Sequence, residues 1–298
     1  MRGRAARSRS RIDSVPARSI PFVKAHGLGN DFLLVEEFAL GGLAPGDLAL
    51  RICDRQTGVG GDGLVVLGAS SAADASFRIF NSDGSEAGLS GNALRCAGAW
   101  ILSKAATPRE CIVLDTRVGL RELFFLSHEG NEWRLRTAIG RPAFSAEDVP
   151  FRPPRAVAEP ITAYPLPVGD TTVPATILSM GNPQCILLVD DWEALDWAAL
   201  GAELERHPYF PDRANIGFVR VLGAERIEAR FWERGAGHTL ASGTGSCACA
   251  VAAHLAGRTG RRVRVEVERG ELLVHWREDG MVELTGPAVI SAEGSFHL

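Results

Sequence analysis

Apolar and polar positions alternate through much of this chain, and the alternation is interrupted by two helix-like segments built from small residues. Residues 227–232 alternate as expected for a strand. After a glycine turn, the segment from Ser242 to His254 consists almost wholly of Ala, Cys, Ser, Gly and Val, and no residue between Gly235 and Gly257 carries a fixed charge. Because a surface helix shows apolar positions on only one face, this segment predicts a buried central helix whose N-terminus points into a pocket.

The same order of strand, polar turn, Ser-Gly pair and small-residue helix occurs earlier in the chain. Three pairs of residues share one spacing of 152 positions (242 − 90 for the last pair): Asn30 and Asn182, Asn81 and Glu233, and Ser90 and Ser242. Three matches at one spacing indicate an internal duplication. Each copy is expected to contribute one buried helix.

The remaining pattern is mostly short strands. Strands are expected at residues 20–26, 32–35, 64–67, 77–80, 111–114, 121–126, 133–138, 175–180, 185–189, 215–221, 227–232, 262–268, 271–276 and 281–285, and further helices at 47–53 and 192–206. The proline-rich stretch 152–167 is expected to join the halves. The fold class is therefore α+β, with two pseudo-symmetric domains, each a mostly antiparallel, barrel-like sheet wrapped round a central helix. The domains are predicted at 22–150 and 151–298.

Composition narrows the function classes. The chain has 298 residues, which suits two domains, and a net charge of −4, which argues against a nucleic-acid partner. The first 21 residues hold six arginines and one acid, with no apolar core after them, so they do not resemble a secretory signal. We expect residues 1–21 to form a disordered extension.

Cysteine usage and hydropathy indicate a soluble, cytoplasmic protein. The six cysteines show no regular framework of spacings, which suggests free thiols in a reducing compartment. The uncharged segment between Gly235 and Gly257 is long enough to cross a membrane but is too polar, so no membrane partner is expected. Cys247 and Cys249 lack the second ligand pair of a zinc site, so no metal is expected.

Two common cofactors are also disfavoured. Lys24 and Lys104 are the only lysines, and neither lies beside a glycine-rich phosphate loop, which argues against a pyridoxal Schiff base. Gly58, Gly60 and Gly63 match a dinucleotide-binding spacing, but a polar segment precedes them and a strand follows, the reverse of what that motif requires. No cofactor is expected.

Two duplicated helices can direct their N-termini at one cleft. Each N-terminus offers free backbone N–H groups and a positive dipole end, which together suit a carboxylate. Ser90 and Ser242 would then face the bound molecule from opposite sides. Acid and base groups on opposite sides of one carbon are what inversion by proton removal and return requires. Serine is also a favoured N-cap, so a purely structural role for both residues remains open.

The motifs that surround these residues resemble the diaminopimelate epimerase family over nearly the whole chain from Phe22. They are the stretches at 26–32, 54–63, 81–85, 91–92, 180–183, 233–237 and 243–245. The resemblance implies a cofactor-independent enzyme that interconverts LL- and meso-diaminopimelate, a small-molecule substrate bound between two pseudo-symmetric domains. It also implies a possible homodimer.

Carried over by motif, the resemblance implies that Ser90 and Ser242 hold the catalytic positions. The implied substrate contacts are Asn30, Gln56, Asn81, Gly91, Asn92, Asn182, Asn215, Glu233, Arg234, Gly243 and Thr244. The α-carboxylate would rest on the amides at 91–92 and 243–244, and Glu233 would face the α-ammonium. Arg234, with the asparagines at 81, 182 and 215, would bind the distal end.

The sequence departs from the family pattern at the positions closest to the chemistry. Ser90 and Ser242 replace the two catalytic cysteines, Gln184 replaces a histidine, His238 a glutamate and Ala93 a glycine. A thiol at a helix N-terminus can supply thiolate near neutral pH, whereas a serine hydroxyl needs a partner base. Cys96, Cys247 and Cys249 are expected to be inert packing residues further inside the helices.

Three function classes follow from these departures. The first is an active epimerase in which serine is assisted by a neighbour such as His238. The second is a lyase or dehydratase, in which one base suffices; a related amino-acid racemase would belong with the first class. The third is a catalytically weakened or inactive paralogue that binds diaminopimelate.

Overall fold

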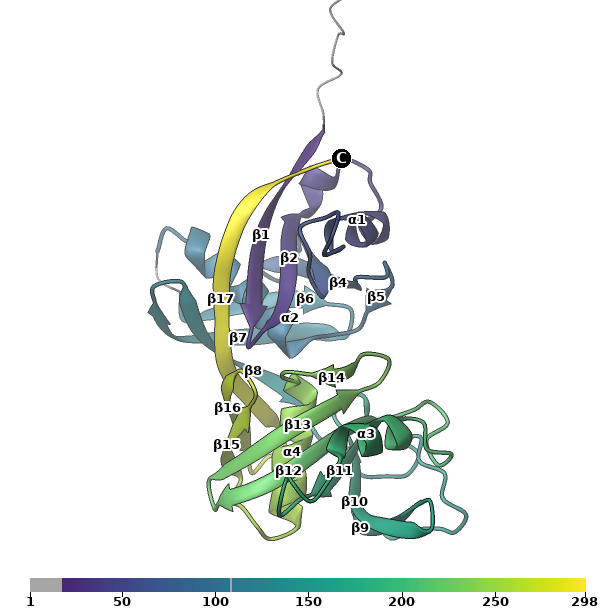
Figure 1. Ribbon diagram of the computed structural model, residues 1–298. Coiled ribbons are helices and arrows are strands. Elements are labelled where there is room, and N and C mark those ends of the chain that lie inside the picture. Colours follow the sequence, from purple (N-terminus) through teal and green to yellow (C-terminus); the bar gives the residue numbers. More distant parts are fainter. Residues whose placement is uncertain (1–17, 108) are drawn as a thin grey trace, which may run out of the picture.

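The computed structural model describes residues 18–107 and 109–298, and its elements form two similar halves joined by one hydrogen-bonded sheet (Figure 1). The first half contains β1 (Ser19–Gly27), β2 (Asn30–Glu36), η1 (Glu37–Leu40), α1 (Pro45–Ile52), β3 (Gly63–Gly68), β4 (Ala75–Asn81), β5 (Glu86–Ala87), α2 (Gly91–Lys104), β6 (Cys111–Thr116), β7 (Gly119–Glu129) and β8 (Glu132–Gly140). The extension predicted for residues 1–21 lies mostly outside the described residues. Strand β1 begins at Ser19, so the last three residues of the predicted extension belong to a strand.

The second half repeats this plan. It contains β9 (Ile161–Val168), β10 (Thr171–Ser179), β11 (Pro183–Leu188), α3 (Trp197–Glu205), β12 (Asn215–Gly223), β13 (Arg226–Glu233), β14 (Gly237–Thr239), α4 (Gly243–Leu255), β15 (Arg262–Val267), β16 (Gly270–Trp276) and β17 (Val282–His297). Helix α3 is shorter than the predicted 192–206, because the Asp196 side chain caps its N-terminus by accepting from Ala199 N at 3.0 Å.

The strand pairings show that the repeat is structural. In the first half β2 and β3 are parallel, β3 and β4 antiparallel, and β4 and β6 parallel. In the second half the pairs β11–β12, β12–β13 and β13–β15 follow the same sequence of directions. Each set surrounds its own helix, α2 or α4. The predicted α+β fold of two similar halves is confirmed.

Both central helices are buried, as their many small residues predicted. Every residue of α2 from Gly91 to Trp100 is buried, and so are ten of the α4 residues between Gly243 and Ala253. Each helix lies at the centre of its own apolar core, and the two cores share only strands β8 and β17. Burying small residues lets the strands approach the helix backbone closely.

The last strand connects the two halves. Strand β17 pairs with β16 through Thr285, then with β8, and finally with β1 as far as His297 (Figure 1). It thus leaves the second half and completes the sheet of the first. The predicted cut between residues 150 and 151 divides the elements along the sequence, but β17 pairs across it.

Residues 152–167, which were predicted to join the halves, also contain most of a strand that was not predicted. Residues 161–168 form β9, which pairs with β10 alone and places Pro165 opposite Pro174. Proline lacks an N–H group and is tolerated at the edge of a sheet, where no second neighbour needs that donor. None of the helices in the described residues is both long and apolar enough to cross a membrane.

Candidate functional site

The N-termini of α2 and α4 meet. A Cβ atom added to Gly243, the first residue of α4, would lie only 3.8 Å from the Cα atom of Gly91, the first residue of α2. Ser90 and Ser242 are the N-caps, and their Oγ atoms accept from Ala93 N at 3.3 Å and Gly245 N at 3.1 Å. The first turns of both helices therefore place partial positive charge at one point between the halves.

One side-chain hydrogen bond is repeated at this junction. In the first half Asn92 Nδ2 donates to Asn30 Oδ1 at 3.0 Å. In the second half Asn182 Nδ2 donates to the Thr244 hydroxyl at 3.3 Å. Each bond ties the residue after a hairpin glycine to the second residue of a central helix, so the duplication extends to individual contacts. Four of the predicted contact residues are brought together in this way.

Ser242 has a carboxylate partner. Its hydroxyl donates to Glu233 Oε1 at 2.6 Å, while its Oγ accepts the helix N–H of Gly245. Ser242 is only 3% exposed, and burial raises the pKa of the Glu233 carboxyl above its ordinary value, an effect that the Ser242 hydrogen bond opposes. The serine proton is thus directed at a partly desolvated carboxyl group.

Ser90 has no equivalent partner. The position related to Glu233 by the repeat is Asn81, which is exposed and donates through Nδ2 to Ser85 Oγ at 2.9 Å. In the part of the chain that the structure describes, the Ser90 hydroxyl is hydrogen-bonded only to Ala93 N. The two caps are alike in backbone geometry and different in their access to a base.

Gln184 lies beneath the second helix N-terminus. It is fully buried, and Nε2 donates to Asn182 Oδ1 at 2.8 Å and to Thr244 Oγ1 at 3.4 Å. Its Oε1 is buried without a hydrogen-bond partner among the described residues. Gln184 thus fixes the orientation of Asn182 and leaves one acceptor unused.

The residues expected at the distal end of a ligand are only partly assembled. Asn215 is buried and accepts from Arg234 N at 2.9 Å, while its Nδ2 donates to Pro183 O at 3.2 Å. The Arg234 side chain is exposed and donates to Asp212 O at 3.0 Å. Within the described ranges, the side chains of Gln56 and Asn81 make no hydrogen bond to another candidate residue.

His238, the neighbour suggested as a helper for serine, faces elsewhere, so that interpretation was wrong. Strands β13 and β14 pair Trp232 with His238, and the alternation of a strand turns both away from Glu233. The His238 ring contacts Glu268 Oε1 through Nε2 and packs edge-on against Trp197 at 5.0 Å between centroids. Glu233, one residue from Trp232, takes the place beside Ser242.

A charged cluster that the sequence analysis did not single out supports Asn30. Asn30 Nδ2 donates to Asp62 Oδ2 at 2.7 Å, and Arg55 bridges Asp62 and Asp31 at 2.7 Å each. Burial opposes ionisation of Asp31, but hydrogen bonds from Arg55 and Lys24 outweigh it and hold the pKa of that carboxyl below its ordinary value. The signal was present as two acids and an arginine within polar, glycine-rich segments.

The cysteines of the central helices are packing residues. Cys96, Cys247 and Cys249 are fully buried, and burial raises the pKa of the Cys96 and Cys247 thiols to about 12. Such thiols stay protonated near neutral pH. In the part of the chain that is described, no group of three or more His, Cys, Asp or Glu side chains could hold a metal ion.

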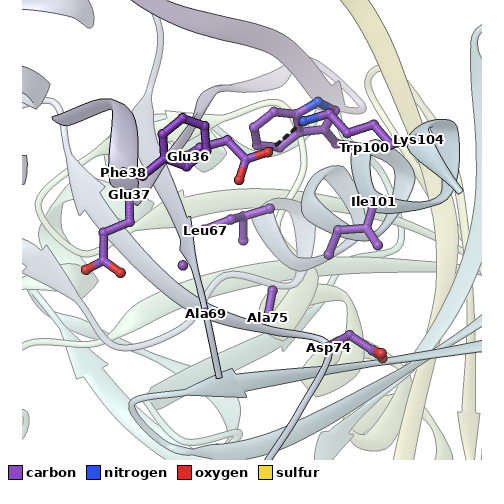
Figure 2. A pocket seen from close by; sticks show the side chains of 11 residues that line it. Glu36, Glu37, Phe38, Leu67, Ala69, Asp74, Ala75, Trp100, Ile101 and Lys104 are labelled. Carbon is purple, nitrogen blue, oxygen red and sulfur yellow. Dashed lines mark hydrogen bonds and ion pairs between the residues drawn. The ribbon is translucent and has the colours of Figure 1, made fainter. Parts of the chain in front are cut away.

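A hollow of about 550 Å³ lies near the opposite end of α2, at Trp100, Ile101 and Lys104. Figure 2 shows its lining, where Lys104 Nζ contacts Glu36 at 2.7 Å. The same ammonium lies 3.8 Å from the centre of the Trp100 ring. Since none of the candidate residues lines this hollow, it is separate from the junction of the helix N-termini.

Comparison with known proteins relates most of the chain to one family. The family model described as diaminopimelate epimerase matches residues 22–143 and 176–291. A diaminopimelate epimerase of Pelotomaculum thermopropionicum is 43% identical over 272 residues, which cover 90% of this chain and 95% of that one. A diaminopimelate epimerase of Desulfitobacterium hafniense is 41% identical over 279 residues, covering 91% and 96%.

Solved structures share the fold at low identity. A phenazine biosynthesis protein of the PhzF family from Bacillus anthracis matches with a TM-score of 0.65 at 17% identity, covering 93% of this chain and 98% of that one. A hydroxyproline epimerase from Agrobacterium vitis, solved with bound trans-4-hydroxy-L-proline, matches with a TM-score of 0.63 at 14% identity, covering 94% and 93%. These two structures therefore share the two-half architecture with this chain.

Proposed function

The chain belongs to the diaminopimelate epimerase family, and from this premise we propose that it interconverts LL- and meso-diaminopimelate by removing and returning the α-proton, with its own side chains and no cofactor. The observation that most supports a site for this reaction is the meeting of Gly91 and Gly243 at two helix N-termini. An amino-acid carboxylate bound there holds its α-carbon between Ser90 and Ser242.

The proposed contacts follow from this placement. The α-carboxylate accepts from the first-turn amides of both helices, at 91–92 and 243–244. Glu233 faces the α-ammonium as well as Ser242, since its carboxylate has two oxygens and Oε1 is the one that Ser242 contacts. The distal end is bound by Gln56, Arg234 and the asparagines at 30, 81, 182 and 215.

We assign proton removal to the pair of Ser242 and Glu233. Ser242 Oγ takes the α-proton while its own hydroxyl proton passes across the 2.6 Å hydrogen bond to the Glu233 carboxylate. The electron pair of the broken C–H bond is left on the planar, carboxylate-stabilised carbon. The helix N-termini stabilise the negative charge that develops on the carboxylate oxygens.

We assign proton return to Ser90 on the opposite face. Its hydroxyl donates the proton that completes inversion and regains one from water, while Glu233 releases its proton to water. Because Ser90 contacts no carboxylate among the described residues, it is the weaker base of the two. Removal from the Ser90 side is therefore the slower direction.

This asymmetry favours a slow epimerase over the other classes. A binding paralogue without turnover needs neither base, yet Ser242 keeps one at hydrogen-bond distance. A lyase or dehydratase needs only one base, which the same pair would also supply. The substrate's fate after proton removal distinguishes these outcomes.

Proton NMR of LL-diaminopimelate incubated with the protein in deuterated water tests the proposal. We expect loss of the α-proton signal together with slow formation of the meso isomer. Exchange without meso product would indicate a one-sided enzyme, and new olefinic or keto products a lyase. Binding without exchange would indicate a paralogue that has lost turnover, and absence of binding would refute the substrate.

Two further features stay predictions. A cytoplasmic location is supported by the six cysteines, all of which are free. A homodimer is implied only by the family resemblance, and sedimentation at several protein concentrations measures it directly.

A further inference from the structure

Among the residues that the structure describes, Arg95 is the largest fully buried side chain, and it lies in the second turn of α2. Its Nε donates to Pro287 O at 3.2 Å, and its Nη2 donates to Asn92 Oδ1. Its Nη1 is buried without a hydrogen-bond partner among the described residues. The guanidinium thus connects α2 to the crossing strand β17 and has one donor to spare.

No carboxylate balances this charge in the described chain. The ionisable groups that act on Arg95 are the thiols of Cys96 and Cys247, and both are protonated near neutral pH. Burial lowers the pKa of Arg95 to about 10, so the side chain still carries its charge at neutral pH. A buried charge is stable in a protein when an opposite charge accompanies it.

The unused donor lies beside the proposed carboxylate site. A Cβ atom on Gly91 would be 3.7 Å from Arg95 Nη1, and Gly91 is the residue that adjoins Gly243 at the helix junction. In the second half the repeat places Cys247 at the position of Arg95 (95 + 152). At this repeat position only the first half carries a cation.

We propose that Arg95 is a positioning residue for the carboxylate of the ligand. Its charge adds to the field of the two helix N-termini, and its hydrogen bond to Asn92 Oδ1 leaves Asn92 Nδ2 free to hold Asn30. The inference rests on the proposed function for the identity of that ligand. The bound carboxylate is the counter-charge that the fold itself does not supply.

A purely structural role of Arg95 predicts a different response to substitution. If Arg95 only fastens α2 to β17, its hydrogen bonds matter and its charge does not. Arg95→Gln keeps amide donors and removes the charge, whereas Arg95→Lys keeps the charge and loses the fork of donors. The two variants therefore separate the two roles.

Calorimetry with diaminopimelate measures the effect on the ligand. We expect Arg95→Gln to raise the Kd by at least about 10-fold, and Arg95→Lys by less than about 3-fold. Arg78→Gln is the matched control, because Arg78 pairs with Glu86 on the surface, and its Kd should equal that of the wild type. Equal losses in the Gln and Lys variants would overturn the inference.

A second measurement does not depend on diaminopimelate. Unfolding midpoints of the wild type are compared in sodium acetate and in sodium chloride at equal ionic strength, since acetate is the simplest carboxylate that can enter the site. We expect acetate to raise the midpoint above the chloride value in the wild type and in Arg95→Lys, and not in Arg95→Gln. If Arg95→Gln fails to fold, Arg95→Met takes its place.

The two proposals fail in distinguishable ways. Stabilisation by acetate that requires the Arg95 charge, without any binding of diaminopimelate, would refute the substrate and keep the role of Arg95. If the wild type binds diaminopimelate but has the same unfolding midpoint in acetate as in chloride, the role of Arg95 is overturned and the substrate is kept.

Discussion

The Ser242 hydroxyl donates to Glu233 across 2.6 Å at the N-terminus of one central helix, whereas the equivalent serine of the other helix, 152 positions earlier, is hydrogen-bonded only to a helix amide in the described chain (242 − 90). The duplication thus keeps the backbone of the two proposed catalytic positions and places a carboxylate beside one of them.

Glu233→Gln should slow α-proton exchange by at least about 100-fold, because an amide cannot take the serine proton. The amide oxygen can still accept from Ser242, so the cap and the fold should be retained. Deuterium washout measured by NMR gives the rate. Glu268→Gln, which removes the exposed partner of His238, is the matched control and should exchange at the wild-type rate.

The exchange rate should rise with pH through the raised pKa of Glu233, because only the ionised carboxyl accepts the serine proton. Glu233→Gln should lack this rise. If the wild type and Glu233→Gln show the same rise of the exchange rate with pH, that rise is due to a group other than Glu233.

The same carboxyl should lower stability as pH rises. Its pKa is higher in the folded protein than in the unfolded chain, so between about pH 4.3, the ordinary value, and the raised value the folded state binds more protons. Unfolding free energies measured across this window should fall with pH more steeply for the wild type than for Glu233→Gln. If the wild type instead gains stability relative to Glu233→Gln as the pH rises, the pKa of Glu233 is lowered in the folded protein and the prediction is wrong.

Arg55→Ala should weaken binding of diaminopimelate more than it weakens the fold. Arg55 holds Asp31 and Asp62, and Asp62 orients Asn30, but its own side chain is 58% exposed. Exposed ion pairs contribute less than about 1 kcal/mol to stability. Thermal unfolding and calorimetry report the two effects, with Arg78→Ala as a surface control. If Arg55→Ala and Arg78→Ala bind diaminopimelate with the same Kd, Asn30 does not contribute to binding of the ligand.

Introducing cysteine at both caps should accelerate inversion. The helix N-termini that favour a thiolate are present whatever the side chain, so Ser90→Cys combined with Ser242→Cys should raise the rate of inversion by at least about 10-fold, a barrier change of about 1.4 kcal/mol. Either single change should do less, since inversion needs an acid on one face and a base on the other. A double variant that binds diaminopimelate and stays inert would place the obstacle at Gln184 or Ala93.

The sequence predicted the features that repeat. A constant spacing and two stretches of small residues were enough for the two halves, the buried helices and the pairing of Ser90 with Ser242. The crossing strand was not predictable in the same way, because β17 pairs with β1 from the opposite end of the chain and no local pattern encodes that pairing.

Which residue contacts Ser242 depends on the face of the strand on which each side chain lies. His238 was suggested as a helper for serine, whereas the alternation of β13 and β14 turns His238 outward and Glu233 is the residue that contacts Ser242. Arg95 was visible as the only charged residue between Ser90 and Ser103, yet its lack of a counter-charge is a property of the packed interior.

The most direct test of the account compares Ser90→Ala with Ser242→Ala in deuterated water, with LL- and meso-diaminopimelate as separate substrates. Because Glu233 serves Ser242 alone, Ser90→Ala should keep α-proton exchange from one of the two configurations and lose inversion, while Ser242→Ala should lose both. Equal exchange rates in the two variants, or exchange that survives only in Ser242→Ala, would contradict the assignment of proton removal to Ser242 and Glu233.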